Sequence, residues 1–498
     1  MKILFVTSEV ESLAKSGGLA DVSRALPIAL KKKGNDARIL LPGYPGAIAQ
    51  LKNPRIEATV GSLLGVDNAT LISGQLPGSD VPVWLIHAPS LFSRGGGLYQ
   101  DDNGRDWADN AHRFAFLAHI AAEIATGRLL DWRPDIVHAN DWHTGLVPLL
   151  VSAKEGPRPG TIFTVHNMAF QGLFPREVLP VIGVPEHFFS AKGIEFYGQI
   201  SFLKAAIRYS DKITTVSPTY AREVLTSELG CGLDGLLRAR RADFCGILNG
   251  IDRELWNPAT DVHLPHRFSA GDISGKRVCK AEIQAELGLA VQPQTPLIGF
   301  ISRLAHQKMA DVILETIPAI VSAGAQFALV GEGEPSLEAA FKALEDRYPQ
   351  NLAVRIGYQE ALAHRLQAGA DILLAPARFE PCGLTQLYAL RYGTAPIVRR
   401  TGGLADTVTD VSFTEPSATG FVFEGADSAG LMGAVERALT LYKEPLAWRR
   451  LQLKGMEEDF GWTASAERYT TLYHEASGID YQAPISSSVD ETIQQLAS

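Results

Sequence analysis

The sequence predicts an α/β fold built from two Rossmann-like, doubly wound domains. Strand-like and helix-like stretches alternate along nearly the whole chain of 498 residues, which is the signature of parallel sheets with helices on both faces. The length allows about three ordinary domains or two large α/β ones. A near-repeat favours two, because KSGGLAD at residues 15–21 returns as RTGGLAD at residues 400–406, each after a predicted strand and before a predicted helix. We expect both turns at the carboxyl ends of their strands, where open α/β sheets bind ligands.

Six strand-like runs occupy each half of the chain. In the first half they lie at residues 2–8, 36–42, 81–88, 135–140, 161–167 and 212–217. In the second half they lie at residues 296–302, 326–333, 352–358, 372–377, 395–400 and 420–425. Helical patterns separate them; after the first strand, for example, Leu19, Val22 and Leu26 share one face. A boundary near Asn249 divides the chain into residues 1–248 and 249–460.

Composition excludes several classes of protein. Hydrophobic residues make up 46% and charged residues 20% of the chain, which excludes a disordered protein. The net charge of -9, without any run of four basic residues, argues against a nucleic-acid partner. The apolar start is too short for a signal peptide, and the longest weakly charged stretch is broken by Pro318 and Gly324, so no membrane association is expected. Four cysteines without a CxxC pair fit a reducing cytoplasm.

Two groups of residues are candidates for binding phosphate. The first is the turn Lys15-Ser16-Gly17-Gly18, where glycines admit a ligand to the backbone and Lys15 adds a positive charge. No GxGxxG fingerprint is present, so a plain turn with a solvated lysine is the alternative. The second is the loop after the strand at residues 296–302, where Arg303 and Lys308 can clamp a pyrophosphate. Its alternative is a pair of solvated surface cations.

A third motif, APARFEPCGLT at residues 375–385, follows a buried strand and precedes an amphipathic helix. The helix start at residues 383–385 is a further anion site, and Glu380 places a carboxylate close to it. Glu380 could instead serve only as a partner for the helix dipole. Cys382 could have a lowered pKa there, or be a small packing residue.

Polar residues beside an aromatic ring follow two strands of the first half, in HANDWH at residues 138–143 and TVHN at residues 164–167. Such a mixture suits a sugar, whose hydroxyls need donors and acceptors and whose ring needs an apolar wall. A metal site with His138 and His143 as ligands is the alternative, but the sequence has no further ligands at the spacing that a zinc site needs. The acidic stretch at residues 100–106 does not fit the EF-hand pattern.

The motifs KSGGLAD, HANDWHT, TVHN, ILNGID, SRLAHQK and RFEPCGLTQLYALRYGT occur in this order along the chain. In order and position they resemble those of bacterial glycogen synthases and plant starch synthases, retaining glucosyltransferases that use ADP-glucose. The resemblance extends from Met1 to about Tyr473. It implies a GT-B fold, in which two Rossmann-like domains face a deep cleft, with the donor on the carboxyl-terminal domain and the glucan acceptor on the amino-terminal one. It further implies that the helix at about 461–480 returns to the first domain, leaving residues 481–498 as a polar tail.

The resemblance also implies roles for single residues. Lys15 and Gly18 would meet the donor phosphates, and Arg303 with Lys308 would hold the distal phosphate as it leaves. Glu380 would lie near the glucosyl ring, whereas Asp141, His166 and Asn249 would line the glucose and acceptor region. Tyr358 would stack on the nucleobase, Asp21 would contact the ribose, and the backbone of Gly383, Leu384 and Thr385 would cradle phosphate. The remaining expected substrate-binding residues are Tyr99, Trp142, Asn167 and Cys382. Neither a metal nor a cofactor is implied.

The sequence departs from the family pattern at three positions. Tyr388 stands where many related retaining transferases have a second glutamate, as in the synthase branch. Ser16 replaces a threonine and Asn140 a common histidine, which weakens any role for position 140.

Three alternatives stay open: a GT-B transferase that uses UDP-glucose, a phosphorylase with a pyridoxal phosphate lysine, and a non-catalytic glucan-binding protein. Nothing in the sequence bears on the oligomeric state.

Overall fold

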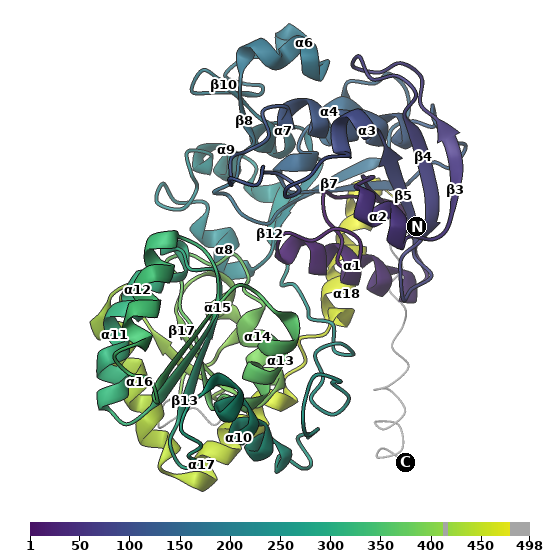
Figure 1. Ribbon diagram of the computed structural model, residues 1–498. Helices are drawn as coiled ribbons and strands as arrows, with labels where there is room; N and C mark the ends of the chain where they lie inside the picture. The colour runs from purple at the N-terminus through teal and green to yellow at the C-terminus, as the bar shows by residue number, and fades with distance from the viewer. Residues whose placement is uncertain (412–416, 479–498) are drawn as a thin grey trace, which may run out of the picture.

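The computed structural model describes residues 1–411 and 417–478. Each of the twelve predicted strand-like runs contains a strand. The predicted tail at residues 481–498 lies outside the described residues. Figure 1 shows two α/β bodies, one above the other, each with a central sheet between helices.

The first body is built on a nine-stranded sheet of order β12-β11-β7-β6-β1-β2-β5-β4-β3. Its strands from β12 to β5 are parallel, whereas β3 and β4 pair antiparallel at one edge. The strands are β1 (Lys2–Val6), β2 (Asp36–Pro42), β3 (Lys52–Thr59), β4 (Thr70–Gln75), β5 (Pro82–His87), β6 (Ile136–Asn140), β7 (Gly160–Val165), β11 (Lys212–Thr215) and β12 (Phe244–Gly246). A separate small sheet consists of β8 (Leu173–Pro175), β9 (Glu195–Phe196) and β10 (Gln199–Ser201).

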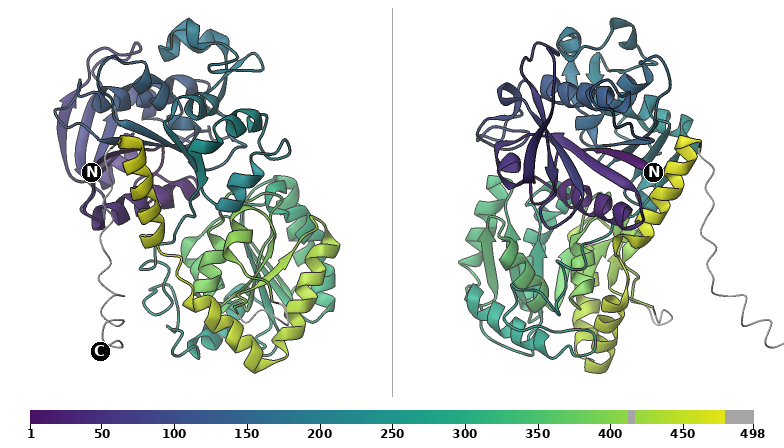
Figure 2. Two further views of the ribbon diagram at one scale, coloured as in Figure 1. Left: turned by 180° about the vertical axis from the view of Figure 1, so that it is seen from behind. Right: turned by 90° about the vertical axis from the view of Figure 1, so that its right-hand side faces the viewer.

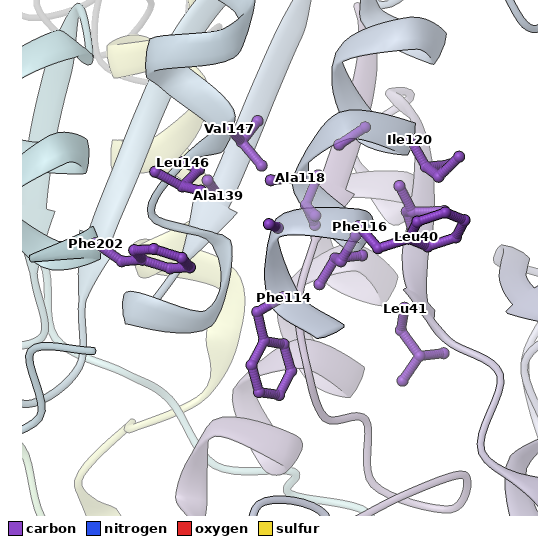
Figure 3. Packing of buried hydrophobic residues seen from close by; sticks show 14 of the residues in the cluster. Leu40, Leu41, Phe114, Phe116, Ala118, Ile120, Ala139, Leu146, Val147 and Phe202 are labelled. Carbon is purple, nitrogen blue, oxygen red and sulfur yellow. The ribbon is translucent and has the colours of Figure 1, made fainter. Parts of the chain in front are cut away.

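Alternate residues of β1 enter two different cores, one on each face of this sheet. Leu4 and Val6 belong to the core beneath α4, α5 and α7, part of which is shown in Figure 3. Ile3 and Phe5 belong to the core beneath α1 and α18. The helices of this body are α1 (Gly18–Lys32), α2 (Pro45–Gln50), α3 (Pro89–Phe92), α4 (Asn110–Ala125), α5 (Val147–Ser152), α6 (Leu179–Ile182), α7 (Phe202–Tyr209), α8 (Pro218–Glu223) and α9 (Asp234–Ala239).

The second body is built on a six-stranded, wholly parallel sheet of order β15-β14-β13-β16-β17-β18. Its strands are β13 (Leu297–Ile301), β14 (Gln326–Gly331), β15 (Leu352–Ile356), β16 (Ile372–Ala375), β17 (Ala395–Arg399) and β18 (Phe421–Phe423). Its helices are α10 (Gly275–Leu287), α11 (Ala310–Ser322), α12 (Pro335–Glu345), α13 (Glu360–Gly369), α14 (Thr385–Arg391), α15 (Gly402–Thr407), α16 (Ser428–Tyr442) and α17 (Pro445–Glu457). The chain runs outward in both directions from β13, which is the doubly wound Rossmann order.

The last described helix, α18 (Trp462–Ser477), leaves the second body and packs on the first, as both views of Figure 2 show. Trp462, Tyr469 and Tyr473 lie in the core that contains Val22 and Leu26 of α1. A hydrogen bond of 2.8 Å joins Nδ1 of the buried His138 to the Tyr473 hydroxyl. No described helix is long and apolar enough to cross a membrane.

Candidate active site

The strand orders bring the predicted site residues to the switch point of each sheet. In the first sheet β1 lies between β6 and β2, so the turn with Lys15 after β1 and the loop with Asp141 after β6 adjoin. In the second sheet β13 lies beside β16, so the loops with Lys308 and Glu380 adjoin. Open α/β sheets bind ligands at such points, beyond the carboxyl ends of the strands.

The two switch points face each other. A Cβ atom added to Gly18, at the start of α1, would lie 3.7 Å from Cδ1 of Leu384 in the second body. Lys15 lies close enough to Tyr358 and Glu360 for both to affect its pKa. The arrangement therefore joins the phosphate-binding candidates of both bodies at one interdomain cleft.

The glycine turn is held by a buried carboxylate that the sequence analysis did not single out. Glu9 Oε2 accepts hydrogen bonds from the backbone N–H groups of Ser16 and Gly17, at 2.7 and 2.8 Å. Its other oxygen accepts one from the Tyr99 hydroxyl at 2.7 Å. Burial raises the pKa of Glu9, against the effect of these three bonds. The N–H groups of Ser16 and Gly17 are thus occupied. The groups of this turn that can bind an anion are the Gly18 N–H and the Lys15 ammonium.

Lys15 and Asp21 form an ion pair at the mouth of this turn, with 2.7 Å between Nζ and Oδ1. Burial raises the pKa of Asp21, and the attraction of Lys15 opposes that shift. Burial lowers the pKa of Lys15, but Asp21, Tyr358 and Glu360 together raise it overall, so the ammonium stays charged. Tyr358 is 52% exposed and lies on the opposite side of the cleft, where a flat ring can stack on its phenol.

Lys308 and Glu380 meet across the switch point of the second sheet. The Lys308 ammonium donates a hydrogen bond to Oε2 of Glu380, and only 8% of Glu380 is exposed. The supporting loops are tied together by Gln307, which donates from Nε2 to the Phe379 carbonyl oxygen at 3.2 Å. Arg303 is exposed, and its guanidinium makes no hydrogen bond or ion pair with any described residue. One cation thus orients the carboxylate, and the other is available to a ligand.

The segment after Glu380 turns sharply into α14. Gly383 has a φ of +73°, in the left-handed region that glycine adopts without strain. The Gln386 side chain donates to the carbonyl oxygens of Cys382 and Gly383, at 3.2 and 3.0 Å. Burial raises the pKa of Cys382 to about 12, so the thiol stays protonated and acts as a packing residue rather than a thiolate. Leu384 and Thr385 follow at the start of α14.

Asp141 and His166 lie together at the ends of β6 and β7. Burial raises the pKa of Asp141 to about 7, and its Oδ1 makes no hydrogen bond within the described chain. Burial lowers the pKa of His166 to about 3, so the ring is neutral. His166 Nε2 lies 3.1 Å from Oδ1 of Asn140. Position 140, which departs from the family pattern, therefore orients His166.

An aromatic wall flanks Asp141. The His143 ring stacks on Tyr99, with 4.2 Å between centroids, and lies 4.0 Å from the Trp142 ring. His143 is buried, and neither of its ring nitrogens has a hydrogen-bond partner among the described residues. His138 is held by Tyr473 and by Thr164, so the two histidines do not converge on a common point as metal ligands would. Asn167 lies at the rim beside His166, half-buried.

Asn249 is a predicted site residue, and Tyr388 is a departure from the family pattern. Asn249, at the passage between the bodies, is 6% exposed, and its Oδ1 has no partner within the described chain. Tyr388 stacks on Trp256, with 3.7 Å between centroids, and Trp256 stacks in turn on His364 at 3.8 Å. The ring at position 388 is thus part of an aromatic stack, and its charged neighbours Asp21, Glu360 and Asp252 are acidic, so a glutamate there would be repelled.

Comparison with known proteins agrees with this geometry. Residues 2–239 match the starch synthase catalytic domain family, and residues 295–440 match glycosyl transferases group 1. A glycogen synthase from Paramagnetospirillum magneticum is 51% identical over 484 residues, which cover 96% of this chain and 98% of that protein. The chain belongs to the glycogen synthase and starch synthase family of glycosyltransferases.

Two further relatives and one more distant structure are also similar to this chain. The glycogen synthase of Burkholderia thailandensis is 51% identical over 94% of this chain and 90% of its own. The catalytic domain of starch synthase IV from Arabidopsis thaliana, solved bound to ADP and acarbose, has a TM-score of 0.88 and 34% identity over 96% of this chain and 99% of that one. Sucrose-phosphate synthase from Thermosynechococcus elongatus shares the fold, with a TM-score of 0.59 and 16% identity over 95% and 98%. The glycogen synthase relatives and the shared GT-B fold make this chain a glycosyltransferase enzyme.

Proposed function

We propose that the interdomain cleft transfers the glucosyl unit of ADP-glucose to the non-reducing 4-hydroxyl of an α-1,4-glucan, with retention of configuration and release of ADP. The observation that carries the proposal is the pairing of Lys308 with the buried Glu380 at the switch point of the second sheet, in the loop that also holds the exposed Arg303. The starch synthase IV structure bound to ADP and acarbose supports a nucleotide donor and a glucan-like acceptor.

The donor would lie against the second body, within residues 249–460. Arg303 and Lys308 supply two positive charges to the distal phosphate, and a leaving diphosphate gains charge as its bond to glucose breaks. Lys15 and the Gly18 N–H approach the same phosphates from the first body. Tyr358 offers a ring to the nucleobase and Asp21 a carboxylate to the ribose, since both lie at the mouth of the cleft. We assign the backbone of Gly383, Leu384 and Thr385 to the donor phosphates as well, with the buried Cys382 packing behind them.

The acceptor would approach over the first body, within residues 1–248 and the helix from residue 461. Tyr99 and Trp142 form a wall of rings, and Asp141, His166 and Asn167 provide hydrogen-bonding atoms at its edge. Oδ1 of Asp141 and Oδ1 of Asn249 have no hydrogen-bond partner among the described residues, so sugar hydroxyls can donate to them. This combination of an aromatic wall and unpaired acceptors fits a glucan chain.

The chemistry needs no carboxylate nucleophile. A double displacement would place such a group behind the anomeric carbon, but Glu380 is already engaged by the Lys308 ammonium. We propose a front-face substitution, in which the departing phosphate oxygen helps to remove the proton of the acceptor hydroxyl. Glu380 would then stabilise the positive charge that develops on the glucosyl ring, while Arg303 and Lys308 stabilise the leaving diphosphate.

The test is nucleotide release with ADP-glucose and UDP-glucose side by side, with and without glycogen. Release of ADP that depends on glycogen, and exceeds release of UDP at equal donor concentration, is the expected result. Faster turnover of UDP-glucose would contradict ADP-glucose as the donor and would favour the alternative of a GT-B transferase that uses UDP-glucose. Binding of glycogen with no nucleotide release from either donor would contradict the proposal.

A cytoplasmic location stays a prediction, which the four free cysteines support.

A further inference from the structure

The second glycine turn, at residues 400–406, is not a free anion site. Its N–H groups are already bonded, and the anion is a side chain of the other body. Gly402 N donates to both carboxylate oxygens of Glu223, at 3.0 and 3.1 Å, and the Thr401 hydroxyl donates to the same carboxylate at 3.1 Å. Glu223 therefore caps the start of α15 from α8.

The contact is reciprocal. Asp406, on α15, accepts from the backbone N–H of Thr219 at 2.8 Å and from the Thr219 hydroxyl at 2.6 Å. Thr219 lies in the first turn of α8, where backbone N–H groups need outside partners. Each body thus supplies a carboxylate to a helix start of the other, and carboxylates are stabilising at that end of a helix. We call this contact, made by Thr219, Glu223, Gly402 and Asp406, the interdomain clasp.

The clasp is in direct contact with the backbone of Glu380. Gly403 N donates to the Glu380 carbonyl oxygen at 3.0 Å. A Cβ atom on Gly402 would lie 1.8 Å from that oxygen, and one on Gly403 would lie 2.2 Å from the Cys382 carbonyl oxygen. Both glycines are buried, and Gly402 has a φ of +44°. The catalytic loop therefore rests on the turn that Glu223 holds, and no larger residue fits between them.

We propose that Glu223 and Asp406 are positioning residues that set the place of Glu380 according to how the two bodies are arranged. When the bodies meet, the clasp fixes α15, and α15 fixes the Glu380 backbone so that its carboxylate reaches Lys308. When the bodies separate, the start of α15 loses its cap and this support is lost. The reaction would thus proceed only with the cleft assembled, which excludes water from the activated donor. The inference rests on the role proposed above for Glu380.

The test compares turnover in Glu223→Ala, Glu223→Gln and Asp406→Asn. The expected result is that kcat falls about 10- to 100-fold in Glu223→Ala, because a small displacement of a reacting group has costs of that order. We expect Glu223→Gln, which keeps an acceptor oxygen at the same place, to recover part of that loss. Glu228→Ala, an exposed glutamate a few residues further along the chain, is the matched control and should leave kcat unchanged. The melting temperature of each variant is measured alongside; should the alanine variant fold poorly, the two amide variants carry the test.

A second measurement separates positioning from general support. If Glu223 acts through Glu380, then Glu223→Ala should hardly lower kcat in a Glu380→Gln background. In a Lys15→Ala background it should lower kcat by the same factor as in the wild type. A kcat within twofold of the wild type in Glu223→Ala, or an equal loss in both backgrounds, would overturn the inference. A Glu380→Gln variant with normal turnover would instead overturn the proposed site, so the two failures are distinguishable.

Discussion

The Lys308 ammonium donates a hydrogen bond to the Glu380 carboxylate across the point where β13 and β16 adjoin, and the exposed Arg303 lies in the same loop as Lys308. A buried carboxylate that already has a cation is fixed in place and cannot easily move onto a substrate carbon. The pair therefore fits a site that stabilises charge on both sides of a breaking bond, rather than one that forms a covalent intermediate. This relationship is the basis of the first prediction.

Glu380→Gln and Lys308→Ala should each reduce glucosyl transfer from ADP-glucose to glycogen by about 100-fold or more, since removing one preorganised charge has effects of that order. Initial rates of ADP release measure the loss. We expect Glu380→Gln to fold normally because it keeps the shape of the side chain. Turnover near that of the wild type in either well-folded variant would refute the site assignment.

Asp141 should make stability depend on pH. Burial raises its pKa from 3.8 to about 7, so between these values the folded chain holds a proton that the unfolded chain releases. Its contribution to stability is complete below pH 3.8 and is lost as the pH rises through about 7. Asp141→Asn cannot ionise, so its melting temperature should exceed that of the wild type by more at pH 8 than at pH 5. Calorimetry at the two pH values checks this, and a difference independent of pH would show that the carboxyl is not perturbed.

Glu9→Gln should weaken donor binding. An amide can keep one neutral oxygen on the N–H groups of Ser16 and Gly17, but its NH₂ group would then face the Tyr99 hydroxyl, which now donates to Glu9. The bonds to the turn lose their charge, so the turn should loosen. We expect the KM for ADP-glucose to rise about tenfold, with a smaller change in kcat, because a charge-assisted contact is worth about 1.5–3 kcal/mol. Glu11→Gln is the control, since Glu11 pairs with Arg24 at 3.2 Å and not with the turn. Equal effects from both variants would contradict a specific role for Glu9.

Tyr388→Glu should destabilise the second body by about 2 kcal/mol or more, because it would place a carboxylate in the aromatic stack on Trp256, near the acidic groups of Asp21, Glu360 and Asp252. Tyr388→Phe keeps the ring and should be nearly neutral. Urea denaturation of the two variants makes the comparison. If Tyr388→Glu were as stable as the wild type, the stack would not explain why a second glutamate is missing here.

Much of the fold could be predicted from the sequence because the buried parallel strands are continuous apolar runs, as in residues 297–301 of β13. The edge strand β3 was missed for the opposite reason. It contains Lys52, Asn53 and Pro54, and most of its residues are exposed, so no hydrophobic pattern marks it. The three short strands of the small sheet have two or three residues each, too few for any pattern to appear.

Within the site, motifs predicted which loops matter but not all the partners within them. The turn at Lys15 was identified, whereas the buried Glu9 that holds it was not, because a lone glutamate after a strand carries no spacing signal. The near-repeat at residues 400–406 correctly indicated a strand-to-helix turn. Its partners, Glu223 and Thr219, are about 180 residues away in sequence, at separations of 179 and 187. Local similarity therefore predicted the shape of the turn but could not identify its partners.

The most direct test of the central claim is the structure of this chain with ADP bound, determined by crystallography. We expect the distal phosphate to contact Arg303 and Lys308, the base to stack on Tyr358, and Asp21 to lie beside the ribose. The clasp between Glu223 and Gly402 should be intact whenever the cleft is assembled around the nucleotide. A diphosphate bound away from Arg303 and Lys308, with the Lys308–Glu380 pair facing solvent, would contradict the account.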